Sequence, residues 1–416
     1  MACGGAQAPA YSRAMPPADA PHGMLVSFAA YLRRQLGPDG PAVAVVGRWE
    51  PLRRVPADAG VAVVAGRRST YAERRFARRT GLQPQWRGTA RARPGGPGEP
   101  FTVWDRWSPA AAGEPPVAFD VLAIVTAYNE AGMMAQTLDR LVAGGIRVHV
   151  IDNWSTDATP AIVERYLPSG RVTVERFPED GPSPYFELRQ LLYRVGEVAH
   201  ESGADWVVHH DCDEIHGSAW PGMGLRQGLW VAQHFGFNCV DNTAVEFRPV
   251  ADTWQPGDDV VTSFEWFEFG ALPAHFTLLR AWRPQQATKP VNAETGGHRV
   301  EFDGRRVFPY KFLMRHYPLR SAAHARQKLF TDRKPRWSPE ERGMGWHVQY
   351  DEYDEGTSFL WAPDQLHRWD ALDEELLLQR LSGVWLPNNP FPEEAAPPGR
   401  EQPAPAGAEE GAVPAR

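Results

Sequence analysis

The stretch WVVHHDCDE, residues 206–214, places two aspartates at the end of an apolar run. Side chains alternate between the two faces of a β-strand, so Asp211 and Asp213 would point the same way and Cys212 the other. Two carboxylates that share a small site repel each other unless a cation lies beside them. Oxygen ligands suit Mg²⁺ or Mn²⁺, which completes its coordination with substrate phosphates and water. A D-x-D triplet also occurs in helix caps and turns, so the flanking sequence must decide between these readings.

The sequence upstream of this stretch alternates predicted strands with predicted helices. The strands are short β-branched runs that end in polar turn residues, at 121–130, 148–159 and 172–176. The helices carry apolar residues at helical spacing, at 131–143, 158–166 and 185–202. We therefore expect an α/β fold with a mostly parallel central sheet flanked by helices. In such a sheet a ligand binds beyond the carboxyl ends of the strands, where Asn129, Asp152 and Asp211 would emerge.

Three motifs in this region resemble those of family 2 glycosyltransferases of the GT-A fold. They are TAYNE at 126–130, DNWSTDAT at 152–159 and ADWVVHHDCDE at 204–214, and they occur in the family's order. The likeness covers about residues 117–215. Beyond it, HFTLLRAW at 275–282, GGH at 296–298 and RHYPLRS at 315–321 resemble a bacterial branch of the family. The resemblance implies a nucleotide-diphospho-sugar transferase fold and metal-dependent, inverting transfer of a sugar to an acceptor hydroxyl.

The resemblance also implies a nucleotide pocket at the ends of the first two strands. Ala127, Tyr128 and Glu130 would line it, and Asp152 would hydrogen-bond the base. An aspartate there can accept from a ring N–H of uracil or guanine, which discriminates against bases that lack the donor. The alternative is that Asp152 only organises the turn that follows it. Trp154 departs from the family's usual glycine, which leaves the geometry of that turn open.

A metal site is the second implication. Asp211 would contact the ribose or metal-bound water, and Asp213 would ligate the Mn²⁺ or Mg²⁺ that joins the two phosphates. His316 would add a metal or phosphate contact, with a structural histidine as the alternative. Arg315, Arg320 and Lys328 could hold phosphate oxygens, but we interpret residues 321–333 as an ordinary basic amphipathic helix.

An inverting transferase also needs a carboxylate that accepts the proton of the acceptor hydroxyl. The segment FEWFEF offers Glu265 and Glu268, and Asp259 precedes it. Alternation along a strand would put Glu265 and Glu268 on opposite faces, so at most one of them faces the site. Other nearby acids are Asp258 and Glu294. The sequence does not choose among them.

Composition fits a soluble cytoplasmic enzyme. The chain has 416 residues with 43% hydrophobic content and a net charge of −7, which argues against nucleic acid as a partner. Three scattered cysteines suit a reducing compartment. We expect no transmembrane segment, because no apolar run reaches about 20 residues. The expected partners are a UDP-, GDP- or dTDP-sugar donor and a glycan, lipid-linked or small-molecule acceptor.

Composition also suggests domain boundaries. Residues 1–23 and 389–416 are rich in Ala, Pro and Gly or Glu, and we expect them to be disordered. Residues 24–116 would form an accessory region and linker, with a helix at 24–36, two valine-rich strands near 43 and 61, an Arg-rich stretch at 67–93 and Pro-rich linkers at 94–100 and 109–116. The glycosyltransferase domain would span 117–388, with a nucleotide-sugar half at 117–220 and an acceptor half at 221–388.

Two other functions remain as alternatives. A nucleotidyltransferase would also bind a nucleotide and a metal on an α/β sheet, but residues 121–130 offer no Gly-rich loop or lysine. A non-catalytic protein could bind a nucleotide sugar or glycan without turnover. The retained Asp211 and Asp213 argue against that second alternative.

Overall fold

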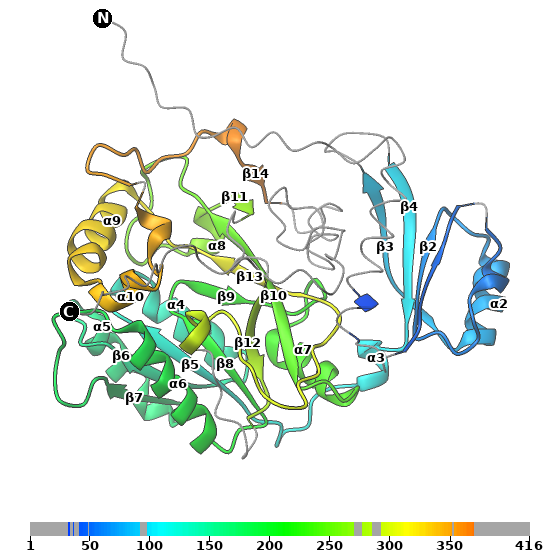
Figure 1. Ribbon diagram of the computed structural model, residues 1–416, viewed down its shortest axis with the longest axis horizontal. Helices are drawn as coiled ribbons and strands as arrows, with labels where there is room; N and C mark the ends of the chain where they lie inside the picture. Colours follow the sequence, from blue (N-terminus) through cyan, green and yellow to red (C-terminus); the bar gives the residue numbers. More distant parts are fainter. Residues whose placement is uncertain are drawn as a thin grey trace, which may run out of the picture.

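The computed structural model describes residues 32–33, 36, 41–48, 50–91, 98–269, 277–284, 293–351 and 353–369 (Figure 1). The segments 1–23 and 389–416, which we predicted to be disordered, lie outside these residues, as does most of the predicted helix at 24–36. The described chain forms a four-stranded sheet near the N-terminus and a ten-stranded sheet in the body. No helix among the described residues is long and apolar enough to cross a membrane.

One half of the large sheet is parallel. Its strands lie in the order β8-β5-β6-β7, and they are β5 (Val121–Ala127), β6 (Arg147–Asp152), β7 (Val172–Arg176) and β8 (Trp206–Asp211). The crossover helices are α4 (Ala131–Ala143), α5 (Thr159–Glu164) and α6 (Leu188–Glu201). All of β5 is buried, as expected of a central strand covered on both faces. The predicted α/β fold, a central sheet flanked by helices, is confirmed.

The other half of the sheet is largely antiparallel. Its strands are β9 (Glu214–His216), β10 (Cys239–Phe247), β11 (Trp266–Phe269), β12 (Leu278–Trp282), β13 (Phe312–His316) and β14 (His367–Arg368). β12 pairs with β8 and so joins the two halves, and β10 follows β12. β13 runs parallel to β10 and pairs with β9, the short strand directly after the D-x-D stretch. The second half of the chain is thereby brought to the end of β8.

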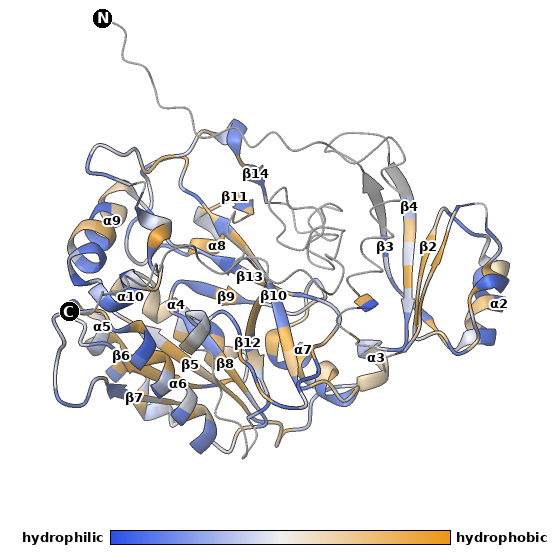
Figure 2. Cartoon of the chain, viewed as in Figure 1, coloured by the Kyte–Doolittle hydropathy of each residue, from blue (hydrophilic) through white to orange (hydrophobic). Residues whose placement is uncertain are grey.

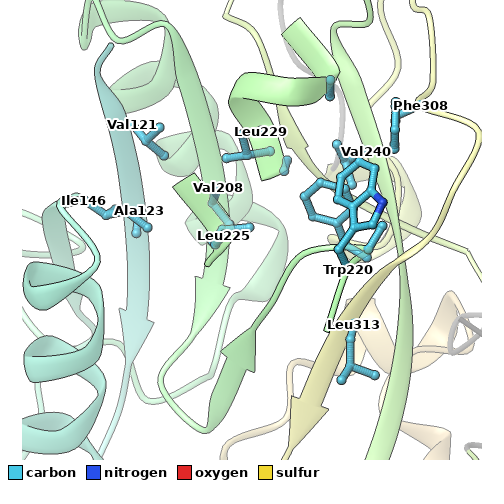
Figure 3. Close-up of a cluster of buried hydrophobic side chains, with 14 of the residues drawn as sticks. Val121, Ala123, Ile146, Val208, Trp220, Leu225, Leu229, Val240, Phe308 and Leu313 are labelled. Atoms are coloured by element: carbon cyan, nitrogen blue, oxygen red, sulfur yellow. The ribbon is translucent and has the colours of Figure 1, made fainter. Parts of the chain in front are cut away.

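Helix α7 (Leu225–His234) packs tightly against both halves of the sheet. Figure 3 shows Leu225 and Leu229 directed toward Val208 of β8 within one buried apolar cluster. Gly228 permits this approach, because a Cβ atom there would lie 2.5 Å from the Cβ of Ser218 and 3.0 Å from the ring of Phe312. Figure 2 shows that the central strands of the large sheet are hydrophobic along most of their length.

The N-terminal sheet has the order β1-β2-β4-β3, with β1 (Val43–Val46), β2 (Val61–Ala65), β3 (Gln83–Arg91) and β4 (Gly98–Asp105). Alternate residues of β2 enter different cores: Val61 and Val63 join the main core, whereas Ala62 and Val64 pack beneath α2 (Thr70–Thr80). The strands near 43 and 61 are confirmed. The predicted linker at 94–100 is wrong at residues 98–100, which belong to β4 and pair with β3; residues 94–97 lie outside the described residues.

Short helices complete the described chain. They are η1 (Leu52–Arg54), α3 (Pro109–Ala112), η2 (Leu167–Ser169), α8 (Val260–Ser263), η4 (Ala293–Thr295), α9 (Ala322–Arg326), η5 (Gln327–Arg333), η6 (Lys334–Arg336), α10 (Pro339–Gly343), η7 (Val348–Tyr350) and η8 (Pro363–Gln365). The segment η5 is a π-helix, a rare form that is frequent at functional sites.

Candidate active site

Three neighbouring strand ends bring the predicted nucleotide and metal residues together. Ala127 at the end of β5 is the register partner of Asp152 at the end of β6. On the other side of β5, Thr126 is the register partner of Asp211, and its hydroxyl donates to Asp211 Oδ1 at 2.9 Å. The parallel pairing therefore places the two aspartates at one edge of the sheet, as the sequence predicts.

The two aspartates of the D-x-D stretch have different surroundings. β8 ends at Asp211, and Asp213 lies in the turn before β9, so strict alternation does not extend through the triplet. Asp211 accepts from Arg280 Nη1 at 2.8 Å. Asp213 is buried and accepts from Lys328 Nζ at 2.6 Å. Burial opposes ionisation of both groups, but the nearby positive charges hold the pKa of each carboxyl below its usual range.

Glu130 and Asp213 both accept a hydrogen bond from the ammonium group of Lys328. The Glu130 carboxylate accepts from Arg320 Nη2 at 2.7 Å and from Lys328 Nζ at 3.1 Å. Both cations are buried, and the guanidinium of Arg320 lies 5.3 Å from the ring of Trp254. The interpretation of 321–333 as an ordinary amphipathic helix is therefore wrong: α9 passes into the π-helix η5, which turns Lys328 into the site. The family resemblance of RHYPLRS at 315–321, directly before this segment, was the sequence feature that could have indicated a functional role for Lys328.

The turn after β6 is held by its own side chains. Asp152 is 1% exposed and accepts from the backbone N–H of Ser155 at 3.2 Å. Burial raises the pKa of the Asp152 carboxyl, and the Ser155 contacts oppose that rise. Trp154 adopts a φ of 60°, where the family has glycine, and its indole N–H donates to the carbonyl of Pro178 at 2.8 Å. The guanidinium of Arg176 covers the Trp154 ring at 5.2 Å. The substitution is thus accommodated by contacts that a glycine could not make.

Tyr128 faces a cation from the second half of the chain. The Arg336 guanidinium lies 4.0 Å from the centre of the Tyr128 ring, and it also donates to Asn153 Oδ1 at 3.1 Å. Asn129 has a φ of 54°, and its side-chain oxygen accepts from the N–H of Thr156 at 2.8 Å. The TAYNE and DNWSTDAT motifs therefore form one hydrogen-bonded rim.

A row of ionisable side chains crosses four strands next to Asp213. The strand registers align Glu268 of β11 with Glu246 of β10, Glu246 with His316 of β13, and His316 with Glu214 of β9. His316 Nδ1 lies 3.4 Å from Glu246, and its Nε2 lies 3.6 Å from Asp213 Oδ1. Burial would lower the pKa of His316, but the two carboxylates raise it well above its usual value. Sequence reasoning found Glu268 and His316 but missed Glu246, which lies inside a strand that is buried along its whole length.

The predicted base candidates lie in different places. Asp259 accepts from backbone N–H groups at the start of α8 and pairs with Arg140. Glu265 is 54% exposed and pairs with Arg368 at 2.9 Å. Glu268 accepts from Arg248 Nε at 2.6 Å, and Arg248 also pairs with Glu246. Of these three carboxylates, Glu268 is the one that the strand registers connect to His316 and Asp213.

Two groups of side chains have ligand types that suit a metal. Asp213 Oδ1 and His316 Nε2, 3.6 Å apart, could both reach one cation of the Mn²⁺ or Mg²⁺ type. The second group, His210, Glu214 and His216, has ligand atoms within 4.8 Å of one another. There, however, Glu214 already accepts from Arg280 at 2.6 Å and lies 2.8 Å from His216. We interpret this buried group as polar support beneath the D-x-D turn.

Comparison with known proteins agrees with this geometry. A family model described as Glycosyl transferase family 2 matches residues 122–184. This segment of the chain is thus similar to glycosyl transferase family 2. It contains β5, β6, β7 and the rim formed by TAYNE and DNWSTDAT. The predicted recognition is therefore confirmed over residues 122–184, which end before the D-x-D stretch.

Two curated relatives match part of the chain. The uncharacterized proteins Rv3786c of Mycobacterium tuberculosis and Mb3815c of Mycobacterium bovis are each 31% identical over 102 residues. The match covers 22% of this chain and spans about a quarter of the length of each relative (25%).

Solved structures of glycosyltransferases show a distant likeness. TarS 1-349 of S. aureus in complex with UDP-GlcNAc is 13% identical, with a TM-score of 0.30, over 50% of this chain and 60% of that chain. Glucosyl-3-phosphoglycerate synthase of Mycobacterium tuberculosis, in complex with Mn2+ and UDP-glucose, is 22% identical, with a TM-score of 0.24, over 33% of this chain and 48% of that chain.

Proposed function

We propose that this protein is a metal-dependent glycosyltransferase that moves a sugar from a nucleotide sugar to an acceptor hydroxyl with inversion. The observation that carries the proposal is the meeting of Asp152, Asp211 and Asp213 at adjacent ends of parallel strands, next to a segment that is similar to glycosyl transferase family 2. We place the activity in the cytoplasm, because the buried Cys212 and Cys239 are free thiols.

The donor would lie across the ends of β5, β6 and β8. Asp152 would accept a ring N–H of the base, which uracil, thymine and guanine all offer, so a UDP-, dTDP- or GDP-sugar fits the site. Ala127 and Tyr128 would line the pocket, and Asp211 would contact the ribose. Glu130 would hold Lys328 at the diphosphate end rather than bind the nucleotide itself, because its carboxylate already accepts from Lys328 and Arg320.

Asp213 and His316 would hold the cation. When bound, Mn²⁺ or Mg²⁺ would neutralise charge on the departing nucleoside diphosphate. Glu246 would orient the imidazole of His316, because its carboxylate lies beside Nδ1 while Nε2 faces Asp213. Lys328 and Arg320 add two buried positive charges on the same side of the site.

The general base that we propose is Glu268. It lies at the partly exposed end of the cross-strand row, so a hydroxyl from solvent can reach it, and Arg248 Nε fixes the position of its carboxylate at 2.6 Å. Its carboxylate would take the proton of the acceptor hydroxyl as the sugar–phosphate bond breaks. Glu265 and Asp259 remain the alternatives, and the acceptor can be a glycan, a lipid-linked glycan or a small molecule.

A thermal-shift panel of UDP, GDP, dTDP and CDP, each with Mn²⁺, Mg²⁺ or chelator, tests the donor site. A nucleotide at 100 times its dissociation constant stabilises the fold by about 2.7 kcal/mol. We expect a shift with one or two nucleotides that disappears with chelator. No shift with any combination would contradict the proposal. Binding without release of nucleoside diphosphate from the sugar donor would instead indicate a non-catalytic protein.

A further inference from the structure

The N-terminal module, residues 41–91, has a charge opposite to that of the chain. It contains eleven arginines and three acidic residues, whereas the whole chain has a net charge of −7. The module is thus net +8 and the rest of the chain is net −15. Charge separation on this scale affects association with charged partners rather than the fold.

The module's fold directs part of this charge outward. Phe76 of α2 is buried against the sheet, while Arg74, Arg75 and Arg78 of the same helix are exposed. Tyr71, one turn before Arg75, is 73% exposed. In Figure 1, α2 lies at the far edge of the molecule, with the N-terminal sheet between it and the body. Figure 2 shows hydrophilic colour on α2 at that edge.

Eight of the module's eleven arginines fall into two groups. One group is used within the module: Arg68 donates to the carbonyl of Gly47 at 2.7 Å, Arg79 to that of Val55 at 2.7 Å, and Arg87 pairs with Glu73 at 3.1 Å. The other group is exposed and forms no ion pair with any residue that the structure describes. Its members are Arg53, Arg67, Arg74, Arg75 and Arg78. Arg53 belongs to η1, which Arg79 ties to the end of α2 through the carbonyl of Leu52.

We propose that this arginine face, Arg53, Arg67, Arg74, Arg75 and Arg78, docks the protein on the anionic phospholipid headgroups of a membrane. Helix α2, which carries Arg74, Arg75 and Arg78, lies at the end of the molecule beyond the N-terminal sheet, so a flat surface can meet it before the large sheet (Figure 1). Body charges more than about 8–10 Å from the surface are screened at physiological salt. A long flexible polyanion would instead meet the net −15 remainder. The exposed Tyr71 suits the membrane–water interface.

The module is fixed to the body, so docking would also orient the active site. Trp86 of β3 stacks on Trp220 of the body, with ring centres 6.1 Å apart. Tyr310 donates its hydroxyl to Asp105 at the end of β4. The same surface would thus hold the catalytic domain at a constant height over the bilayer. This inference does not depend on the proposed reaction.

The test is cosedimentation of the full-length protein with vesicles of phosphatidylcholine alone or with about one-third phosphatidylglycerol. We expect binding to the anionic vesicles only. Each arginine near such a surface contributes about 1 kcal/mol, so Arg74→Glu with Arg78→Glu should lower the partition coefficient by at least ~30-fold. The matched control, Arg165→Glu with Arg171→Glu, makes the same charge change at exposed positions of the body and should change it by less than about threefold.

Several results would overturn the docking proposal. They are equal partitioning of the two double variants, no binding of the wild-type protein to anionic vesicles, or binding of a DNA duplex more tightly than those vesicles. The last result would point to nucleic acid as the partner. Matching far-ultraviolet circular dichroism and thermal unfolding of both variants would show that the fold is intact.

Discussion

The Nζ of Lys328 lies 2.6 Å from Oδ2 of Asp213 and 3.1 Å from Oε1 of Glu130. One ammonium group thus joins the D-x-D turn to the end of the TAYNE motif, and all three side chains are buried. Burial lowers the pKa of Lys328, but the two carboxylates outweigh this effect and raise it. The charge balance of the donor site therefore depends on a residue from the second half of the chain.

Lys328→Met should destabilise the protein in chelator by about 3 kcal/mol, because two buried carboxylates lose a partner. Saturating Mn²⁺ should restore more stability to this variant than it adds to the wild-type protein, since Asp213 is then free to bind the cation. Thermal unfolding with chelator and with Mn²⁺ measures both effects. Lys334→Met is the control, because Lys334 donates to the carbonyl of Tyr353 rather than to a carboxylate. If Mn²⁺ stabilises the two variants equally, Lys328 does not compete with the metal for Asp213.

Glu246→Gln should weaken Mn²⁺ binding by roughly 10- to 100-fold, because His316 loses the carboxylate that orients it. Titration of free Mn²⁺ by electron paramagnetic resonance measures this affinity directly. Glu301→Gln removes an exposed carboxylate that pairs with Arg299, and it should leave Mn²⁺ binding unchanged. If Glu246→Gln binds Mn²⁺ as tightly as wild type, the positioning role is wrong.

Glu268→Gln should lower kcat for sugar transfer by at least about 100-fold while leaving the affinity for the donor nucleotide unchanged, since it loses the proton acceptor only. Glu265→Gln, which lies directly before β11 and pairs with Arg368, should keep most of its activity. The comparison is made with initial rates at saturating donor. The reverse ranking of the two variants would move the base to Glu265.

The buried carboxyl of Asp105, at the junction of the module and the body, should make the stability of the protein depend on pH. Burial raises the pKa of this carboxyl to about 7, against the hydrogen bond from Tyr310. Between about pH 4 and pH 7 the folded state keeps a proton that the unfolded state has released, so stability falls as the pH rises through this window. Relative to Asp105→Asn, the wild-type protein should lose up to about 4 kcal/mol across it. Urea unfolding at pH 4.5 and 8 measures the difference, and a pH-independent difference would show that Asp105 is already ionised in the fold.

Gly228→Ala should destabilise the fold by roughly 1–3 kcal/mol, because the added methyl group meets Ser218 and Phe312. Gly224→Ala is the matched control: it lies four residues earlier, and a Cβ atom there meets nothing within 4 Å. Because Gly224 is the N-cap of α7, its replacement by Ala should cost less than about 1 kcal/mol. Denaturant unfolding of both variants is sufficient, and similar midpoints would mean that α7 does not pack closely on β13.

The parallel half of the fold could be predicted because its signals are local. Residues 131–143 form α4 and residues 172–176 form β7 with the predicted bounds, since hydrophobic period and turn residues agree there. Asp152 and Asp211 could be placed together because strand ends in a parallel sheet share one edge. The structure adds the strand order, in which β6 and β8 lie on either side of β5.

The second half could not be predicted in the same way, because its site residues depend on pairing between distant strands. Glu246 is one residue in an uninterrupted buried strand, and only the β10–β13 register puts it beside His316. Lys328 resembles a surface lysine until the π-helix turns it inward. Long-range register and an irregular helix leave no periodic signal in the sequence.

Nucleoside diphosphate release from a UDP-, GDP- or dTDP-sugar, compared between the wild-type protein and Asp213→Asn in Mn²⁺, tests the central claim most directly. The account predicts release by the wild-type protein from at least one donor, loss of that release with chelator, and a decrease of at least about 1,000-fold in the variant, with the fold retained by circular dichroism. Equal release by Asp213→Asn, or wild-type release that chelator does not change, would contradict a metal-dependent transferase at the D-x-D turn.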